Sequence, residues 1–546
     1  MTTHIEARPH VTLRPANLVR HLRTRSLETW IVILGSLLAG AAYAWFAGED
    51  INWDWQNYHE YGAFALLNGR FGWDVAPAGI QTFLNPLAYV PAYLLRHHVG
   101  APFWGMILGA IHGLNLALIY WLSRSLLGSA ANAWTLAASV VIAAFGPMTL
   151  SEVGTSFADI LTAMPIIAGL GLILFADAEQ RTRHVVAGIL IGAAVGLKLT
   201  NMVFFIGAFA SFLVAARPLR AMSWFVVGSA IGGLATGGAW AWMLWEQFGS
   251  PLFPFYNTIF RSPEAPIAPI VDLRFMPRSL GEAVAYPFYW LIGDHPSSEG
   301  PFRDPRFAVV FVLLVANAAA GLFYKARIPA RPDKQFLIFF CVAYVTWLAT
   351  FSIHRYAVAL ELLAAPLIVV LLTHLLRAIR SSSFGVDPAA LNNYVAVAAG
   401  LAIALWSQPA DWWRRPWSSP FQPQRSERLT NPATYILLQK PLGYVVPLLP
   451  PGSRAYQLAD ILLPIAPGGS LDRRIRTGLA DPLPGGVWAM YHRGSPPPQH
   501  LLDGYGLQFD ASRPCETIQG AEGTTQGPDG GDVAVCPLVS TGSQSE

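Results

Sequence analysis

The chain has 546 residues, of which 53% are hydrophobic and only 13% are charged, and its mean hydropathy is +0.40. An ordinary soluble domain carries about 25% charged residues, so a soluble globular fold is excluded. The net charge is only +3, and basic residues are scattered between apolar runs, which argues against a nucleic-acid-binding surface. Uncharged runs of about 17 to 24 residues, long enough to cross a bilayer, predict a polytopic membrane protein.

The first apolar run, Trp30–Ala47, contains no charged residue and follows a segment rich in arginine. It predicts a retained transmembrane helix with a cytoplasmic N-terminus rather than a cleaved signal peptide. If the run 185–216 is a pair of helices broken around Lys198, the chain is an all-α membrane protein with about 11 transmembrane helices. The further runs are 103–122, 131–150, 158–176, 185–216, 222–245, 307–324, 336–353, 356–376 and 390–406.

The distribution of basic residues supports this topology. The segments assigned to the cytoplasm hold 16 Lys and Arg in 76 residues, whereas the segments on the other side hold 9 in 130. This asymmetry is what the positive-inside rule predicts. A single tilted helix across 185–216 would instead invert everything that follows it.

The chain then divides into a cytoplasmic segment 1–29, a transmembrane domain 30–406 and an extracytoplasmic C-terminal domain 407–546. Two large extracytoplasmic loops, 48–102 and 246–306, interrupt the transmembrane domain. The prolines and aromatic residues of the second loop predict an ordered cap over a cavity.

The C-terminal segment differs in composition, because it holds 19 of the chain's 42 prolines. Its start, SQPADWWRRPW, is typical of an interfacial Trp/Arg segment at a membrane surface. Later stretches such as GGVWAMYHR and DVAVCPLV predict short strands, and hence a small mixed α/β domain. Cys515 and Cys536 could form a disulfide there, with two free thiols as the alternative, and Cys341 is expected to be a small buried hydrophobe. The final TGSQSE is expected to be disordered.

The first extracytoplasmic loop interleaves acidic and aromatic residues. Carboxylates among flat rings suit a carbohydrate, whose hydroxyls take charged hydrogen bonds and whose C–H faces stack on rings; an aromatic belt with solvated acids is the alternative. The spacing from Asn57 to Leu67 predicts an amphipathic helix along the membrane plane, which would hold Asp54 just above the bilayer. The stretch GEDINWDWQNYHEYGAFALLNGRFGWD contains Asp50, Trp53, Asp54, Trp55, Tyr58, His59, Glu60, Tyr61, Trp73 and Asp74.

Other ionisable residues are expected at membrane depth on the same side, where such groups are functional candidates by default. The turn SEVGTSFAD carries Glu152 and Asp159, which would share a face if the turn is helical; ordinary helix capping is the alternative. Lys198 in GLKLTN suits a phosphate partner, and a salt bridge to Asp159 or Glu152 is the alternative. SIHRYAVALE places His354 and Arg355 at a helix start. Glu361, which follows, is expected to be a buried hydrogen-bonded group or part of the same cavity. The second loop adds Arg261, Asp304 and Arg306.

These motifs together carry a family resemblance. The acidic first loop, SEVGTSFAD, GLKLTN, GSPLFPFYN in the second loop and HRY at a helix start resemble the GT-C superfamily of integral-membrane glycosyltransferases. Within it, the chain is most similar to the polyprenyl-phosphate-dependent enzymes of glycosyltransferase family 87. The resemblance covers about residues 28–406.

The resemblance implies a polyprenyl-phosphate-sugar donor and a glycan or glycolipid acceptor, in a multi-pass protein of a bacterial inner membrane with a periplasmic C-terminal domain. By position, it makes Asp54 the general base, with Asp50 as competitor because the loop lacks an adjacent acidic pair. Lys198, Arg355 and His354 would bind the donor phosphate. The acceptor or sugar would contact Trp53, Trp55, Tyr58, His59, Glu152 and Asp159. Some members of the superfamily need a divalent metal, so the resemblance leaves a metal open.

A secondary transporter or lipid flippase is the alternative from another class, because it also keeps ionisable residues in membrane helices. The sequence shows no convincing internal repeat, and the polar residues gather near one membrane face. A non-catalytic subunit or receptor would explain the C-terminal segment but not Lys198 or the acidic loop. An enzyme predicts instead that Asp54, Lys198 and Arg355 converge at an outward-facing pocket.

Overall fold

The computed structural model describes residues 15–177, 179–324, 330–379, 387–460, 462–494, 498–519 and 532–541. Arg8 and Arg14, on which the predicted orientation partly rests, lie outside these ranges. So does all but the first residue of the TGSQSE terminus.

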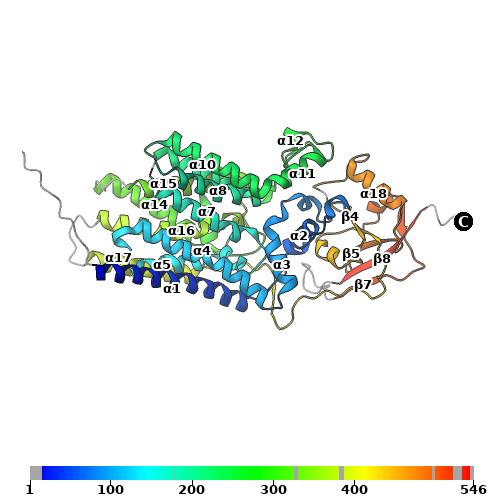
Figure 1. Ribbon diagram of the computed structural model, residues 1–546, viewed down its shortest axis with the longest axis horizontal. Coiled ribbons are helices and arrows are strands. Elements are labelled where there is room, and N and C mark those ends of the chain that lie inside the picture. Colours follow the sequence, from blue (N-terminus) through cyan, green and yellow to red (C-terminus); the bar gives the residue numbers. More distant parts are fainter. Residues whose placement is uncertain are drawn as a thin grey trace, which may run out of the picture.

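A bundle of apolar helices forms one end of the molecule, and a small sheet domain forms the other (Figure 1). In the described ranges, five helical segments are long and apolar enough to cross a membrane: Ser26–Ala47, Phe103–Ala130, Pro218–Phe248, His354–Ile379 and Pro388–Trp406. Four shorter apolar helices accompany them. The helical membrane class is therefore confirmed, while the count of about eleven crossings stays a prediction.

The helices of the bundle are α1 (Pro15–Ala47), α4 (Phe103–Leu127), α5 (Ala133–Ala144), α6 (Pro147–Glu152), α7 (Ala158–Leu174), α8 (Arg181–Leu197), α9 (Met202–Ser211), α10 (Pro218–Gly233), α11 (Ala239–Phe248), α14 (Arg306–Tyr324), α15 (Arg331–Thr350), α16 (Val358–Ile379) and α17 (Pro388–Trp406). The first loop adds α2 (Glu60–Leu67) and α3 (Val90–His98), and the second adds α12 (Asn257–Phe260) and α13 (Leu280–Ile292).

Helix α16 is the centre of the bundle. Its residues from Val358 to Leu371 are buried on every side, because it contacts α4, α5, α7, α14, α15 and α17. A helix that is apolar all round belongs inside a bundle, whereas α1 and α17 expose most of their apolar surface, as helices facing lipid do.

Helices α8 and α10 approach each other through glycines. Gly188 and Gly192 on α8 face the backbone of α10, and Gly228 and Gly232 on α10 face the backbone of α8. A Cβ atom at any of the four would lie only 2.0 to 2.1 Å from a carbonyl oxygen of the other helix. This is the small-residue packing that membrane helices use to bring backbones together.

The helical path is interrupted at both turns that the sequence singled out. Helix α8 ends at Leu197, and a 3-10 turn (Leu199–Asn201) follows Lys198, so the expected break in 185–216 is present. In SEVGTSFAD, α6 ends at Glu152 and α7 begins at Ala158, with Gly154 in a left-handed conformation between them. The two carboxylates therefore lie on different helices and do not share one helical face.

The C-terminal domain is a mixed α/β unit, as predicted. Its sheet has the order β4-β3-β5-β8-β6, with β7 paired to β8. β3 runs parallel to both β4 and β5, whereas β8 is antiparallel to its neighbours. The disulfide between Cys515 and Cys536 is present. The elements are β3 (Thr434–Leu437), β4 (Arg454–Gln457), α18 (Ser470–Ala480), β5 (Val487–His492), α19 (His500–Asp503), β6 (Leu507–Phe509), β7 (Glu516–Ile518) and β8 (Val533–Ser540).

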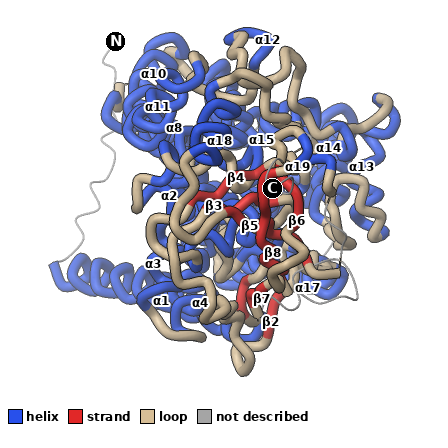
Figure 2. Tube along the Cα trace, turned by 90° about the vertical axis from the view of Figure 1, so that its right-hand side faces the viewer, coloured by secondary structure: helices blue, strands red, loops and turns tan. Residues whose placement is uncertain are grey.

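The first loop lies between the helical bundle and the sheet, and it packs with the C-terminal segment into one body (Figures 1 and 2). β1 (Glu49–Asp50) pairs with β2 (Arg414–Arg415), and Val75 extends the sheet at the edge of β4. Trp55 and Tyr61 of the loop share a hydrophobic core with Tyr435 and Tyr444 of the domain. The sheet domain is therefore held against the first loop by strand pairing and a shared core, and not only by its covalent connection.

This packing bears on two expectations. Residues 57–67 are helical, as predicted, and 54–63 are buried, so this helix packs within the protein. In the SQPADWWRRPW segment, Trp412 is buried, and Arg414 donates hydrogen bonds to the carbonyls of Ser151 and Val153. The position of both segments relative to the membrane stays a prediction, because a sequence pattern does not distinguish burial against lipid headgroups from burial against another part of the chain.

Candidate active site

Asp54 lies in the first turn of a helix that starts beneath the sheet domain. Asn52 caps that helix by accepting a hydrogen bond from the Trp55 amide, and a π-helical turn (Trp55–His59) leads into α2. The π-turn brings Tyr58 to Asp54, to which its hydroxyl donates at 3.2 Å. The Asp54 side chain stays 10% exposed.

Arg355, from a distant part of the sequence, forms an ion pair with Asp54. It belongs to the 3-10 turn His354–Ala357 that starts the α16 segment, and its Nη1 donates to Asp54 Oδ2. Its Nε is buried without a hydrogen-bond partner in the described residues, so this guanidinium retains an unused donor. Burial alone would raise the pKa of Asp54, but the charge and hydrogen bond of Arg355, together with interactions with His59 and Lys198, outweigh it, so the pKa lies below its usual value.

Lys198 forms a second ion pair close to the first. Its Nζ lies 2.6 Å from Asp159 Oδ2 and 4.5 Å from the centre of the Tyr356 ring. The helix break places it there, because Lys198 directly follows the last residue of α8. Its charge also helps to lower the pKa of Asp54, so the two pairs act on one another. The charges of Lys198 and Arg355 therefore both act on Asp54, while an outward-facing pocket shared by the three stays a prediction.

Glu152 joins this group through a helix start. One carboxylate oxygen accepts a hydrogen bond from the amide of Ile160 in the first turn of α7, and the other is buried without a partner in the described part of the chain. Glu152 therefore caps the start of α7, which was the simpler interpretation of this turn. Its other carboxylate oxygen remains a free acceptor near Lys198.

The carboxylate of Asp50, in contrast to that of Glu152, has no oxygen without a hydrogen bond. Its Oδ1 accepts hydrogen bonds from the backbone and side-chain amides of Asn52, and its Oδ2 accepts from the backbone and hydroxyl of Ser156. The residue is only 1% exposed. This set of bonds joins the first loop to the turn before α7, which is a structural role.

The aromatic residues of the first loop separate into two kinds. Trp55 is buried against Phe421 and Tyr444, and the guanidinium of Arg96 lies 4.0 Å from its ring centre, so its faces are covered. Trp53, next to Asp54 in the chain, stays partly exposed.

His59 is packed rather than open. It stacks on Tyr89 at 4.0 Å and bonds to the Ser156 hydroxyl, and burial lowers its pKa to about 3. A small cavity adjoins it, lined in part by Asp50, Glu60 and Arg96. Asp54, Lys198 and Arg355 do not line that cavity.

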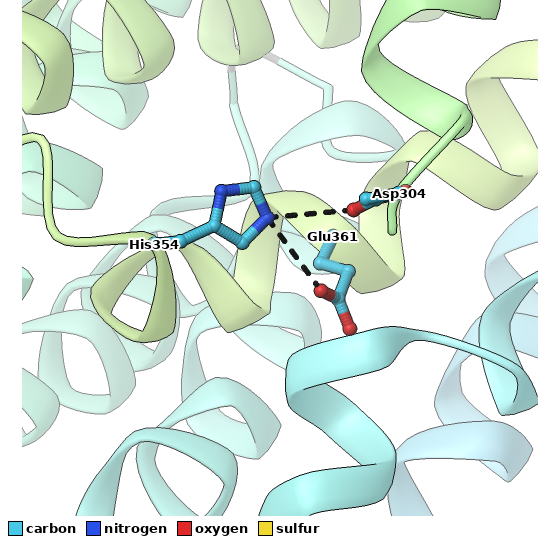
Figure 3. A group of neighbouring side chains, drawn as sticks. All are labelled: Asp304, His354 and Glu361. Atoms are coloured by element: carbon cyan, nitrogen blue, oxygen red, sulfur yellow. Dashed lines mark hydrogen bonds and ion pairs between the residues drawn. The ribbon is translucent and has the colours of Figure 1, made fainter. Parts of the chain in front are cut away.

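His354 turns away from Arg355 into a buried charge cluster (Figure 3). Its Nε2 lies 3.4 Å from Asp304 and 3.9 Å from Glu361, and all three residues have 0% exposure. Glu361 also accepts hydrogen bonds from Met148 and Thr149, as the expectation of a buried, hydrogen-bonded group requires.

The donor types in this cluster could in principle bind a metal ion. Arg306, however, pairs with Asp304 at 2.8 Å and with Glu361 at 3.2 Å, so a guanidinium already occupies the position beside both carboxylates that a metal ion would take. The residues present do not fit a metal, and the cluster fixes the start of α16 instead. Arg261 is exposed in the second loop.

Three further residues near the site were not predicted to belong to it. Tyr89 stacks on His59, and nothing in its local sequence marks it. Tyr356, whose ring lies against Lys198, is the last residue of the HRY motif, which was a usable signal. Lys440 reaches the first loop from the C-terminal domain, with Nζ 5.8 Å from the Trp53 ring. It is the only lysine after residue 406, which was a usable signal.

The fold and this charged site define a membrane enzyme. Residues 82–351 match the family model of glycosyltransferase family 87, which confirms the resemblance, and the protein is a glycosyltransferase. The matched region includes Asp159 and Lys198 but not Asp54, Arg355 or the C-terminal domain. No curated protein matches the chain.

Proposed function

We propose that this glycosyltransferase moves a sugar from a polyprenyl-phosphate donor to a hydroxyl of an extracytoplasmic glycan or glycolipid, with inversion. The observation that carries the proposal is the convergence of the Asp54–Arg355 and Lys198–Asp159 pairs at the end of the helical bundle, under the sheet domain. A carboxylate for the acceptor and cations for a phosphate leaving group are what this transfer needs.

In the proposed step, the acceptor hydroxyl oxygen attacks the anomeric carbon while the bond from that carbon to the phosphate oxygen breaks. Asp54 takes the hydroxyl proton, and the polyprenyl phosphate leaves with the electron pair. A single displacement inverts the anomeric centre. Proton removal by a positioned base contributes about 10²- to 10⁴-fold to such a rate.

Asp54 is preferred to Asp50 as the base because of their hydrogen bonds. Both oxygens of Asp50 already accept two hydrogen bonds each, whereas Asp54 bonds through one oxygen to Tyr58 and Arg355. The second oxygen of Asp54 has no hydrogen bond among the described residues that would compete with a substrate hydroxyl.

Arg355 and Lys198 are the proposed phosphate ligands. Each now balances an aspartate, and a donor phosphate would share these cations, with the unpartnered Nε of Arg355 as one further donor. Charge-assisted hydrogen bonds of this type are the strong ones. His354 is left out of the proposal, because Asp304 and Glu361 enclose it.

The experiment is turnover of a panel of polyprenyl-phosphate sugars by purified protein in lipid nanodiscs, followed as donor consumption and as product. Asp54→Asn is expected to lose about 10²- to 10⁴-fold in rate with normal expression and thermal unfolding. Asp50→Asn, the matched control, is expected to lower thermal stability while the folded fraction keeps activity. Wild-type turnover by Asp54→Asn would overturn the assignment, and loss of turnover only in folded Asp50→Asn would move it.

The proposed orientation puts the N-terminus in the cytoplasm and the site on the periplasmic side of a bacterial inner membrane. It is supported by the density of basic residues in the predicted cytoplasmic segments. Labelling of single cysteines introduced at exposed positions of the second loop and of α19 by a membrane-impermeant reagent tests it, since both are expected to react from outside.

A further inference from the structure

The parallel strands of the C-terminal domain all end on the side that faces the first loop. β4, β3 and β5 are adjacent and parallel, so their carboxyl ends share one edge of the sheet. Gln457 and Asp460 follow β4, Gln439 and Lys440 follow β3, and His492 ends β5. In open α/β sheets, ligands bind at this edge.

Hydrogen bonds hold the strand ends in one rigid group. Gln439 accepts from the backbone amide of His492 at 2.8 Å, and Gln457 donates to the carbonyl of Gln439 at 3.1 Å. Asp460 accepts from the amide of Ile80 in the first loop. Gly79 makes that approach possible: its φ is +62°, and a Cβ atom there would lie 1.8 Å from the Asp460 carboxylate.

Lys440 brings this edge to the proposed base. Its Nζ lies 3.0 Å from Gln81, 3.2 Å from Asp460 and 5.8 Å from the ring centre of Trp53, the residue before Asp54. Asp54 and Lys440 are close enough for their charges to interact. An acceptor hydroxyl within hydrogen-bond reach of Asp54 therefore lies beside Trp53 and below the strand ends.

His492 is the unexplained polar group at this edge. Both of its ring nitrogens are buried; the backbone of Lys440 interacts with the ring, but neither nitrogen makes a hydrogen bond of good geometry within the described ranges. Burial lowers the pKa of His492, so the ring is neutral, with one donor and one acceptor nitrogen. Buried polar atoms in folded proteins normally have partners, and a sugar hydroxyl can both donate and accept.

We propose that the edge formed by Lys440, His492 and Gln81, with the ring of Trp53, is the acceptor subsite, and that it binds an uncharged sugar. The inference rests on the proposed glycosyl transfer. A neutral sugar is favoured over an anionic one because two carboxylates, those of Asp460 and Asp54, act on Lys440 and would repel an anion. The aromatic face of Trp53 suits the C–H face of a pyranose or furanose ring, and the polar groups suit its hydroxyls.

The test is acceptor kinetics of His492→Phe and Lys440→Gln with n-octyl glycosides of neutral hexoses and pentoses as probes, using a donor that the wild type consumes. Each variant is expected to raise the acceptor KM roughly five- to tenfold, as expected for one lost hydrogen bond, with kcat and the donor KM within about twofold. His500→Phe is the matched control, because His500 is exposed on α19, and it should leave all constants unchanged.

Unchanged acceptor KM in both variants would overturn the subsite while glycosyl transfer stands. A fall in kcat with an unchanged acceptor KM would also contradict it, since that is the result of a folding or chemical defect. Preference for n-octyl glucuronide over the neutral probes would overturn the uncharged ligand class. Absence of any donor consumption by the wild type would instead defeat the proposed function itself.

Discussion

Asp54 and Arg355 show how two residues that are distant in sequence set each other's chemistry. Asp54 is buried, which by itself favours the protonated acid, and the guanidinium is the largest of several effects that together reverse that preference. His59, whose pKa is about 3, is neutral at ordinary pH. Between about pH 4 and pH 8, the proposed base is therefore ionised and its histidine neighbour uncharged.

This arrangement predicts the effect of Arg355→Gln on the pH profile. In the wild type, the acid limb of kcat/KM is expected below about pH 4, because the pKa of Asp54 is lowered. Without the guanidinium, burial raises the pKa of Asp54, so we expect the acid limb to move to higher pH. We also expect the maximum of kcat/KM to fall. Profiles normalised to each maximum measure the shift. Superimposable acid limbs would show that Arg355 does not control Asp54.

At the scale of elements, the position of Lys198 depends on how α8 packs. The helix carries Lys198 at its end, and its glycines fix its distance from α10. Small residues let the two backbones meet, and the Asn85 amide donates to the carbonyls of Gly196 and Thr236 at the end of this contact.

Gly192→Leu should therefore separate the two helices. Its side chain would begin 2.1 Å from the carbonyl oxygen of Ser229, and overpacking of this kind costs about 1 to 3 kcal/mol. We expect a lower thermal unfolding temperature and a higher donor KM. Gly35→Leu is the control, because no atom lies within 4 Å of a Cβ there. Equal stability of the two variants would refute the packing role.

The disulfide is the second element-scale feature. It closes a loop between residues 21 positions apart, for which chain entropy predicts about 3 kcal/mol of stabilisation. Replacement of both Cys515 and Cys536 by serine should lower the unfolding temperature of the C-terminal domain and speed its limited proteolysis. The wild type in reductant should behave like the double variant, and proteolysis at the unaltered rate would count against the prediction.

At the scale of the whole molecule, the sheet domain and the first loop behave as one folding unit. Their side chains form a common core, and β1 of the loop pairs with β2 at the start of the C-terminal segment. The proposed base lies at this junction, so the domain that covers it also orders it.

Gly443→Ala tests this coupling. A Cβ atom at Gly443 would lie 2.0 Å from the carbonyl oxygen of Asn57, in the helix that follows Asp54. We expect a loss of about 1 to 3 kcal/mol in stability and a fall in kcat, because the helix must shift. Gly504→Ala, where no atom lies within 4 Å, is the matched control. A Gly443→Ala protein with normal turnover would show that the domain only covers the loop.

The sequence by itself determined the membrane class, the glycosyltransferase family and the α/β nature of the C-terminal domain. These follow from local composition, spacing and motifs, which a single segment carries. The helix break at Lys198 and the Cys515–Cys536 pair were each one of two alternatives, and the structure decided between them. Only the tertiary structure decided which charged residues meet: Arg355 pairs with Asp54, while its neighbour His354 turns to Asp304. It also decided that the first loop is buried by the C-terminal domain and that Lys440 reaches Trp53. Such contacts join residues from 50 to more than 300 positions apart, and hydrophobic periodicity records only that a face is buried, not which partner buries it.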